Sequence, residues 1–463
     1  MSIIIPANSA VGGGFSIDNS ARFSSAGSDY LSRTASSTGN RQIFTFSTWV
    51  KRGKINTVYN TLFYAGANSN TGGTIAFRFT DANNLNVFIQ DIGQFITTNR
   101  IFKDPSAWYH IVLAIDTTQA TPDNRRKLYI NGVQETSFST STEVNRNLSL
   151  SVNTAGQLQR IGVHANSSGS PGEYFDGYMA ETVLIDGQQL APTSFGEFDE
   201  DSGAWKPIDV SGLTFGTNGF HLDMASSTEL GTDVSGNSNN LAENNLQPVD
   251  QTTDTCTNNF ATLNPFAPMS TSVVQTLTEG NLKAVPSSGW NAAYSTIPLS
   301  AGKWYVEVYI GGLGGSNEIT IGLNPDNFTN TSDTAHSFTT TGVWYNSNGQ
   351  KWVGNSNSSY GASYDDDDVI GIAINMTDSQ VTFYKNNSSQ GTIGFNSNLT
   401  GAASIIFGLD SVETTSITYT NFGNPALAGQ DNATDENSRG SFKYAPPGGY
   451  LSICTANLSG VLS

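Results

Sequence analysis

The sequence predicts an all-β protein, and three observations support this prediction. Only 13% of the 463 residues are charged, against about 25% in an average soluble domain, and Ser, Thr, Asn and Gly fill the polar positions instead. Apolar residues alternate with a period of two in many short segments, which is typical of strands. Long amphipathic helical patterns are missing from the sequence.

The clearest pair of strands lies between residues 369 and 385. Residues 369–376 place Ile and Met on one face of a strand and smaller residues on the other. Apolar residues also alternate in residues 381–385, which are predicted to be the antiparallel partner strand. Residues 377–379 make the polar turn between them, and a second turn is predicted at Asn386, because asparagine tolerates a left-handed backbone. This segment is one ribbon of a larger antiparallel body.

More strands follow one another between residues 21 and 200. Residues 44–51 carry large side chains at both parities, which predicts a strand buried on both faces. Asn131 and Gly132 are the residue pair that most favours a two-residue hairpin. The order of these segments predicts a sandwich of two antiparallel sheets. The other strands predicted in this part of the chain are residues 74–79, 85–90, 108–116 and 127–134.

The length exceeds what one core usually supports, so two domains are expected. Glycine and polar residues at the start predict an extended arm, and a stretch rich in Gly, Asn, Ser and Asp predicts an ordered linker. The predicted parts are an arm at 1–20, a sandwich at 21–200, a linker at 201–260, a second sandwich at 261–423 and a closing segment at 424–463.

The formal net charge of −18 argues against nucleic acid or an anionic membrane as a partner. The basic run Arg125 to Lys127 is interpreted as a solvated hairpin end. No apolar run is long enough to span a bilayer, and no secretory signal is visible, so we expect synthesis in the cytoplasm without insertion into a membrane. Cys256 and Cys454 do not make a disulfide framework, and buried free thiols are favoured over a bridge between them.

Several segments resemble known families when they are taken in order. FTFSTWVKR, WYHIVLAID, KLYINGVQ and YFDGYMAETVLIDGQQL resemble the laminin G and pentraxin type of concanavalin A-like jelly roll, over about residues 21–200. GKWYVEVYI, ITIGL, VWYNSNGQKW and DDVIGIAINMTDSQVTFYKNN resemble a SPRY (B30.2) domain, another concanavalin A-like sandwich, which ends near Gly423. The resemblance therefore implies two jelly-roll sandwiches in tandem.

The terminal FKYAPPGGYLSICTANL resembles the closing segment of structural proteins of tailed bacteriophages, and TNNFATLNPF and DVSGNSNN resemble their linkers. This resemblance implies a virion protein of the tail fibre, spike or adhesin type. It also implies a homo-oligomer, with a trimer favoured. The arm at 1–20 is the segment expected to dock to other virion proteins.

Catalytic residues are not predicted. The four histidines, His110, His164, His221 and His336, show no pair at the spacing of metal ligands. Glycosidases with sandwich folds can place two carboxylates on one face of a strand. Glu181 and Asp186 are five residues apart and therefore fall on opposite faces, and Glu307 is interpreted as a buried, hydrogen-bonded carboxylate.

The run Asp365, Asp366, Asp367 and Asp368 is the one candidate metal site. Calcium prefers several carboxylate and carbonyl oxygens, and it would relieve the repulsion among four adjacent acids. Adjacent side chains of an extended segment point in opposite directions, however, and a charge run in a loop is usually solvated. The sequence favours the solvated loop and leaves calcium open, so no cofactor is predicted.

Trp352 and Tyr360 are candidate ligand contacts, because exposed aromatic rings can stack on sugars. Trp344 is assigned to the core instead. The favoured function is a non-enzymatic phage structural protein that attaches the virion to a host-surface glycan or protein. Two alternatives stay open: a glycan-binding lectin module, with or without calcium, and a capsid-decorating head fibre without a receptor role.

Overall fold

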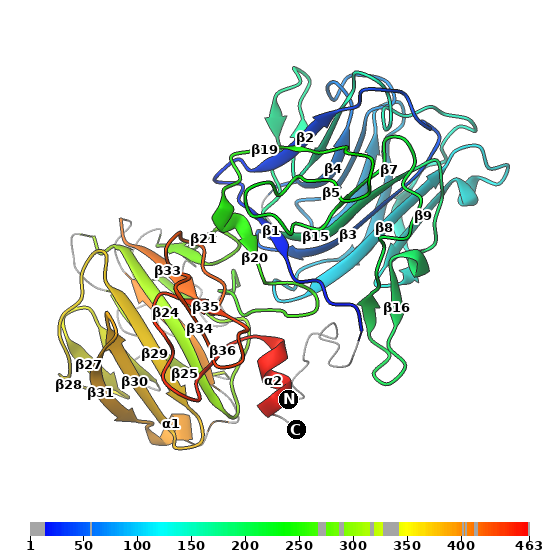
Figure 1. Ribbon diagram of the computed structural model, residues 1–463. Helices are drawn as coiled ribbons and strands as arrows, with labels where there is room; N and C mark the ends of the chain where they lie inside the picture. The colour runs from blue at the N-terminus through cyan, green and yellow to red at the C-terminus, as the bar shows by residue number, and fades with distance from the viewer. Residues whose placement is uncertain are drawn as a thin grey trace. The chain divides into compact units, whose positions relative to one another are not determined.

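The chain folds into two units, Met1–Thr257 and Asn258–Ser463, and each unit is a sandwich of two antiparallel sheets (Figure 1). The predicted all-β class with two sandwiches in tandem is confirmed. The computed structural model describes residues 14–55, 58–266, 275–286, 291–314, 319–326, 342–400, 402, 405–411 and 415–461. His336 and Gly12 lie outside this described part.

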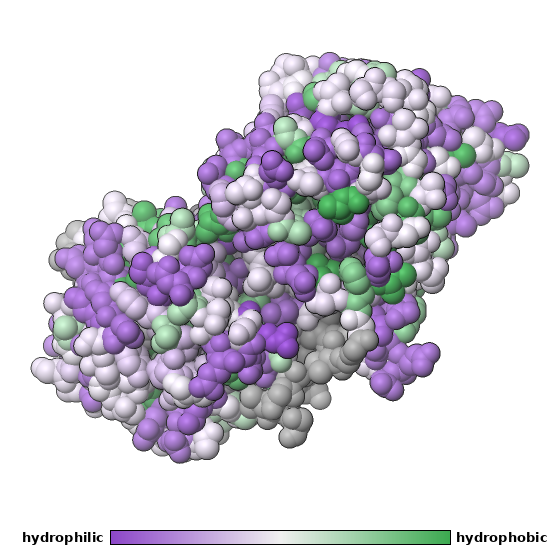
Figure 2. Space-filling model, in the orientation of Figure 1, coloured by the Kyte–Doolittle hydropathy of each residue, from purple (hydrophilic) through white to green (hydrophobic). Residues whose placement is uncertain are grey.

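Helices are short throughout the described residues. The α-helices are α1 (Ser397–Thr400) and α2 (Thr455–Val461), and the 3-10 turns are η1 (Pro122–Arg125), η2 (Pro192–Ser194) and η3 (Pro248–Asp250). None of the helices in this part of the chain has the length and apolar character needed to cross a membrane. On the face drawn in Figure 2, hydrophilic and intermediate residues predominate and hydrophobic ones form small scattered patches.

The first unit pairs two eight-stranded sheets, which we call the β3 sheet and the β5 sheet after a central strand of each. The β3 sheet runs in the order β10 (Val133–Gln134), β9 (Arg126–Ile130), β8 (Trp108–Asp116), β3 (Ile43–Arg52), β15 (Gly177–Asp186), β1 (Ser20–Phe23) and β20 (Gln251–Thr252), with β18 (Phe220–Leu222) also paired to β15. The β5 sheet runs in the order β11 (Phe138–Ser141), β7 (Gly93–Ile101), β6 (Asn84–Ile89), β5 (Ile75–Phe79), β4 (Asn60–Ala65), β12 (Leu158–Ile161), β2 (Tyr30–Thr34) and β19 (Ala242–Asn244). Two small ribbons complete the unit, β13 (His164–Ala165) with β14 (Pro171–Gly172), and β16 (Gly196–Phe198) with β17 (Trp205–Pro207).

The main core of this unit lies between the two sheets. Phe46 of the β3 sheet stacks on Phe63 of the β5 sheet with ring centroids 4.8 Å apart and meets Phe77 edge-on at 6.2 Å. Such pairs add to the stabilisation that burial of the rings supplies. Phe44, Phe46 and Val50 belong to this core, whereas Trp49 does not. The period of two therefore turns Trp49 to the outer face of the β3 sheet.

That outer face is buried as well, under residues 190–215 and 253–257, which we call the cover segment. Phe195 and Phe215 pack on one apolar cluster of the outer face, and Trp205 and Cys256 pack on another that includes Trp49. The prediction that residues 44–51 are buried on both faces is confirmed, because the β3 strand is buried from its second residue to its last.

A chain of polar groups joins the cover segment to the sheet. Trp205 donates a hydrogen bond from Nε1 to Nδ1 of His110 (2.9 Å), and Nε2 of His110 lies 2.9 Å from Oγ of Ser47. His110 is 1% exposed, so each of its ring nitrogens needs a partner inside the protein, and each has one.

Residues 201–260, predicted as a linker, contribute instead to the first unit up to Thr257. They supply part of the cover segment and the strands β17, β18, β19 and β20. The strands are two or three residues long, too short to show a period of two. Strands β18 and β20 extend the β3 sheet and β19 extends the β5 sheet, whereas β17 packs on the apolar outer face of the β3 sheet through Trp205. The predicted arm, residues 1–20, also overlaps this unit, because Ile17 is 3% exposed and Ser20 begins β1.

The second unit pairs an eight-stranded β24 sheet with a six-stranded β25 sheet. The β24 sheet runs in the order β21 (Thr276–Thr278), β22 (Lys283–Val285), β33 (Ile417–Asn421), β24 (Lys303–Gly312), β29 (Val369–Asn375), β30 (Gln380–Lys385) and β31 (Ser388–Gly394), with β36 (Leu451–Ser452) parallel to β24. The β25 sheet runs in the order β23 (Asn291–Tyr294), β32 (Ile405–Ser411), β25 (Ile319–Pro325), β26 (Val343–Asn346), β27 (Gln350–Val353) and β28 (Ser356–Ser359). A ribbon of β34 (Ala433–Thr434) and β35 (Ser441–Phe442) follows.

The hairpin predicted between residues 369 and 385 is confirmed as β29 and β30. The register pairs Ile370 with Lys385 and Asn375 with Gln380. The turn predicted at Asn386 is confirmed too, because its φ of 48° is left-handed, as the tight turn into β31 requires.

The closing segment is fastened to β24 through Glu307, which is 2% exposed. Its Oε2 accepts a hydrogen bond from the amide of Lys443 (2.7 Å), and its Oε1 accepts from the amide of Tyr444 (3.0 Å) and the hydroxyl of Tyr305 (3.1 Å). Burial raises the pKa of Glu307 to about 7, although these donors lower it. The predicted buried, hydrogen-bonded carboxylate is confirmed.

Replacing Glu307 by alanine should therefore destabilise the second unit. The change leaves two partly buried amides and a buried hydroxyl without their acceptor, and we expect a loss of about 3 kcal/mol in the free energy of unfolding. Urea denaturation of Glu307→Ala measures this loss. Asp431→Ala, at an exposed carboxylate, is the control and should change stability by less than about 0.5 kcal/mol. Equal stability of the two variants would contradict this account of the closing segment.

The first unit should lose stability in mild acid because of His110. Burial lowers the pKa of His110 to about 3, so below the ordinary value of 6.5 the unfolded chain binds a proton that the folded chain does not. Stability is therefore fully present above pH 6.5 and is lost as pH falls, at about 1.4 kcal/mol per pH unit. Between pH 7 and pH 5 we expect a loss of about 2 kcal/mol in the transition of the first unit, and His110→Gln should remove that part of the loss.

His221 provides a control whose pKa shifts in the opposite direction to that of His110. Burial lowers its pKa, but the hydrogen bond and charge of Glu181, 2.6 Å away, outweigh burial and raise it. The stability that His221 contributes to the first unit is present in acid and is lost as pH rises through the raised pKa. His221→Gln should therefore steepen the loss of stability of this unit in acid. A shallower loss in that variant would refute the assignment.

Candidate functional site

The structure does not bring Trp352 and Tyr360 together. Trp352 on β27 is paired in register with Trp344 and packs with it in a small cluster away from the main core. The neighbouring Lys351 points to the other face of β27, where its Nζ lies 5.3 Å from the centre of the Tyr360 ring. Trp344 is fully buried, as predicted, although in this side cluster.

Tyr360 is used by the fold itself. Its ring meets Tyr345 edge-on at 5.2 Å and Phe383 at 6.1 Å, and its hydroxyl donates to the carbonyl of Gly391. Burial raises the pKa of Tyr360 to about 12. The ring and hydroxyl thus contribute to packing, and a ligand contact at either predicted aromatic residue stays a prediction.

The aspartate run forms the turn that leads into β29. Oδ1 of Asp366 accepts a hydrogen bond from the amide of Leu313 (2.6 Å), and Oδ1 of Asp367 accepts one from the hydroxyl of Tyr309 (2.5 Å). Asp367 has a φ of 68°, so the turn needs a residue that tolerates the left-handed region, and Asp is one of these. These two side chains connect the turn to the end of β24.

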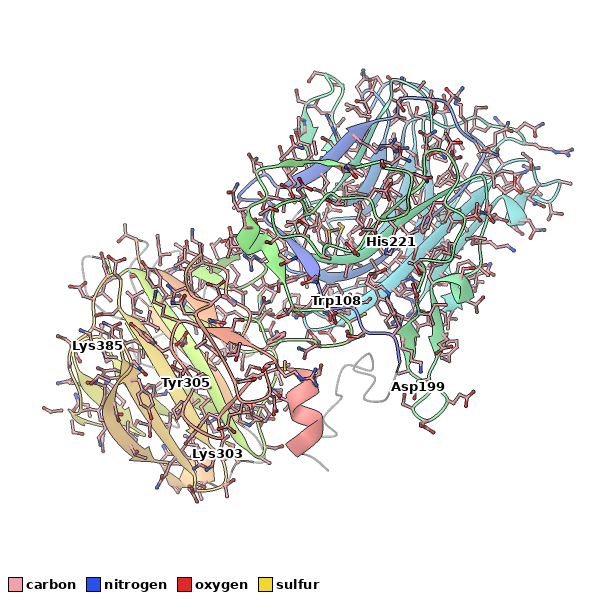
Figure 3. The ribbon with its side chains drawn as sticks, in the orientation of Figure 1. Trp108, Asp199, His221, Lys303, Tyr305 and Lys385 are labelled. Atoms are coloured by element: carbon pink, nitrogen blue, oxygen red, sulfur yellow. The ribbon has the colours of Figure 1, made fainter. Side chains whose placement is uncertain are left out.

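The other two aspartates are held within the same turn and by β30. Oδ2 of Asp368 accepts from the amide of Asp365 (2.7 Å) and lies 3.0 Å from Nζ of Lys385, which Figure 3 labels. Its Oδ1 accepts from Nδ2 of Asn386 (2.6 Å). Over the described ranges, no group of three or more His, Cys, Asp or Glu side chains could hold a metal ion. Calcium binding to this run stays the open alternative to the solvated loop.

Glu181 and Asp186, weighed as a carboxylate pair, have separate partners. Glu181 contacts His221, whereas Asp186 accepts hydrogen bonds from the amides of Asn40 (2.7 Å) and Asn218 (3.0 Å). Asp186 therefore joins loops at the end of β15. Cys256 and Cys454 are both free and buried, as predicted.

A cavity of about 280 Å³ lies at one edge of the first unit, where the two sheets end. The β3 sheet ends there with β9 and β10, the β5 sheet ends with β7 and β11, and residues 135–137 cross from one to the other. The lining residues are Ile96, Asp123, Arg126, Lys127, Leu128, Gln134, Glu135, Thr136, Phe138 and Ser141. Because this is the rim of a sandwich, the cavity has an apolar floor from the core and polar walls from the strand ends.

The walls hold charged groups that the fold has fixed. Oε2 of Glu135 accepts a hydrogen bond from Nε of Arg100 (2.8 Å), and the amide of Ser137 donates to its Oε1 (3.0 Å). Burial raises the pKa of Glu135, but these donors outweigh burial and lower it, so the carboxylate is charged at neutral pH. Arg126 donates to the carbonyl of Thr142 (3.0 Å) and to Oγ of Ser141.

Other groups on the rim are available to a ligand. Within the described part of the chain, no hydrogen bond or ion pair occupies the side chains of Asp123, Lys127 or Gln134. Together they bring an ammonium group, an amide and a carboxylate to the lining of the cavity, to which Leu128 and Phe138 add apolar surface. Convergent donors and acceptors over an apolar floor are typical of small-molecule sites.

The signal for this cavity in the sequence is weak, and the interpretation placed on it is wrong. The run Arg125 to Lys127, predicted as a solvated hairpin end, has Arg125 and Arg126 at 8% and 9% exposure. Arg125 donates to the carbonyls of Gln119 (2.8 Å) and Val144 (2.7 Å). Backbone carbonyls satisfy these cations, and such partners leave no pattern in the sequence.

Comparison with known families agrees with the two folds. Residues 25–189 match the model of the concanavalin A-like lectin/glucanases superfamily, and residues 303–421 match the model of the SPRY domain. The chain therefore carries a concanavalin A-like domain followed by a SPRY domain, as the resemblances implied. No curated protein matches the chain.

Three solved structures illustrate the likeness. A human SPRY domain is 18% identical over 30% of this chain and 90% of that chain, with a TM-score of 0.25. A heptameric SAP-like pentraxin from Limulus polyphemus is 15% identical over 38% of this chain and 78% of that chain, with a TM-score of 0.29. A putative carbohydrate binding protein from Bacteroides ovatus is 17% identical over 50% of this chain and 59% of that chain, with a TM-score of 0.34.

Proposed function

We propose that this protein is a non-enzymatic structural protein of a bacteriophage virion, of the tail fibre, spike or adhesin type, and that it attaches the particle to a host-surface glycan. The tandem of two sandwich domains supports a role in binding. The resemblance of the closing segment and linkers to phage structural proteins supports the virion. The cavity at the edge of the first unit is the observation that carries the choice of ligand.

A glycan suits this cavity on chemical grounds. A sugar ring has apolar C–H faces and a rim of hydroxyls that both donate and accept hydrogen bonds. The cavity offers the partly exposed ring of Phe138 to such a face, and Lys127, Gln134 and Asp123 to the hydroxyls. These side chains are donors, acceptors or both, so a neutral polyhydroxylated ligand can satisfy all of them.

Assembly into a trimer would strengthen such binding. One shallow site gives modest affinity, but linked copies turn later binding events into intramolecular ones and raise the overall avidity. An oligomer of weak sites fits a particle that must hold a surface covered with repeated sugars.

Glycan binding tests the proposed ligand. Lys127→Ala and Gln134→Ala should each weaken binding on a glycan array about tenfold, because each removes a hydrogen bond to the sugar. Lys103→Ala, at an exposed lysine outside the cavity, is the matched control and should bind normally. Repeating the array with a chelator tests calcium at Asp365–Asp368, and we expect unchanged binding. Binding that survives both cavity variants would exclude this site.

Incorporation into particles tests the virion role. Since Ile17 and Ser20 belong to the first unit, the deletion should stop at residue 13. We expect the protein without residues 1–13 to fold normally and to be missing from purified particles, as measured by immunoblot and by labelled particle images. Normal incorporation would contradict docking through the arm. A protein that enters particles but binds no host surface would be a decorating fibre.

A further inference from the structure

One ion pair of the first unit is completely withdrawn from water. Nζ of Lys51, near the end of β3, lies 2.7 Å from Oδ2 of Asp254, and the two side chains are 1% and 0% exposed. Asp254 belongs to the cover segment, just beyond β20. Lys51 has the same parity as Trp49 and so lies on the outer face of the β3 sheet, beneath the cover.

The surroundings fix both partners in place. Nε1 of Trp108, which Figure 3 labels, donates to the other carboxyl oxygen, Oδ1 of Asp254 (3.1 Å). The ring of Tyr178 lies 5.5 Å from Nζ of Lys51. The carbonyl of Asp254 accepts from Oγ of Ser20 (2.6 Å), and its amide donates to Oγ1 of Thr252 (3.1 Å). The carboxyl group is therefore held rigidly against the amine.

Burial favours the uncharged forms of this pair. Removing a charge from water is costly, and two buried opposite charges can relieve that cost by passing a proton from the ammonium to the carboxylate. Burial lowers the pKa of Lys51, although the charge of Asp254 raises it. A neutral amine is a nucleophile, and a neutral carboxyl is open to attack.

We propose that Lys51 and Asp254 condense into an intramolecular isopeptide bond. Lys51 gives one proton to Oδ2 of Asp254, and the amine lone pair then attacks Cγ. A hydrogen bond of this length holds the nitrogen within about 3.5 Å of Cγ, the separation from which such an attack starts. Trp108 donates to Oδ1, where the negative charge develops, as an oxyanion-hole donor does. The C–Oδ2 bond breaks, Oδ2 takes a second proton from the nitrogen, and one water leaves.

Two other Lys–Asp pairs hold the same groups at positions that are more exposed to solvent. Lys206 and Asp199 are 3.2 Å apart with side chains 16% and 18% exposed, and Lys385 and Asp368 are 3.0 Å apart at 26% and 13%. Water stabilises the charged forms of these pairs, so neither amine is a nucleophile. They serve as controls within the same chain.

The bond would join the last segment of the first unit to the strand at its centre. A pull on the chain beyond Thr257 would then pass from Asp254 directly into β3, and residues 253–257 of the cover segment could not peel away. Such a crosslink suits a protein that carries load, but its formation depends only on the buried pair and not on the ligand or on the virion role.

Mass spectrometry of the full-length protein tests the proposal. After denaturation and complete trypsin digestion, we expect the peptides that contain Lys51 and Asp254 to appear joined, lighter than their sum by one water, with fragment ions that place the link between these two residues. Lys385 should be cleaved normally, and fragment ions of the Asp254 peptide should show Lys206 without a link, because trypsin does not cut the Lys206–Pro207 bond. In Asp254→Ala and Lys51→Met the joined peptide should disappear, and thermal unfolding of the first unit should shift to lower temperature.

Separate Lys51 and Asp254 peptides from the folded wild-type protein would overturn the proposal. So would equal crosslinking at the two exposed pairs, because the burial argument would then be wrong. Since the wild-type digest decides the question, failure of either variant to fold does not affect the result.

Discussion

Burial of the outer face of the β3 sheet is the constraint on which the first unit depends. A sandwich needs only one apolar face per sheet, but here both faces of this sheet carry large apolar side chains. A third layer is therefore required, and the chain supplies it with residues 190–215 and 253–257. This explains why the chain beyond the matched concanavalin A-like region, which ends at residue 189, still belongs to the unit as far as Thr257.

The polar residues on that face determine where the cover lies. Thr45, Ser47 and Lys51 occur at alternate positions of β3, and each is buried. Oγ1 of Thr45 accepts from the amide of Leu190 (2.9 Å), Ser47 contacts His110, which accepts from Trp205 (2.9 Å), and Lys51 pairs with Asp254. Buried polar groups tolerate few alternatives. A cover shifted along the strand would leave them without partners, so they give the layer a unique register even where they add little net stability.

The sequence predicted the elements whose signals are local. The β29–β30 hairpin is predicted because isoleucines occupy alternate positions between two turns. The hydrogen-bonded state of Glu307 is predicted correctly because a single carboxylate buried in an apolar strand needs hydrogen-bond donors. Residues 201–257 are predicted as a linker because their strands have two or three residues and their apolar residues are spaced irregularly. The cavity was missed because its walls come from η1, β7, β9, β10 and β11, and only the folded sandwich brings these together.

The turn at Asn131 and Gly132 has a consequence for how related proteins can differ. Hairpin tips normally accommodate insertions, because nothing packs on them. Here a Cβ on Gly132, where φ is 77°, would lie 2.2 Å from the indole of Trp205. Trp205 of the cover segment therefore packs directly on this hairpin tip. In relatives that keep a tryptophan there, we expect this loop to keep its length, while natural length variation accumulates at turns that face solvent, such as the tip between β16 and β17.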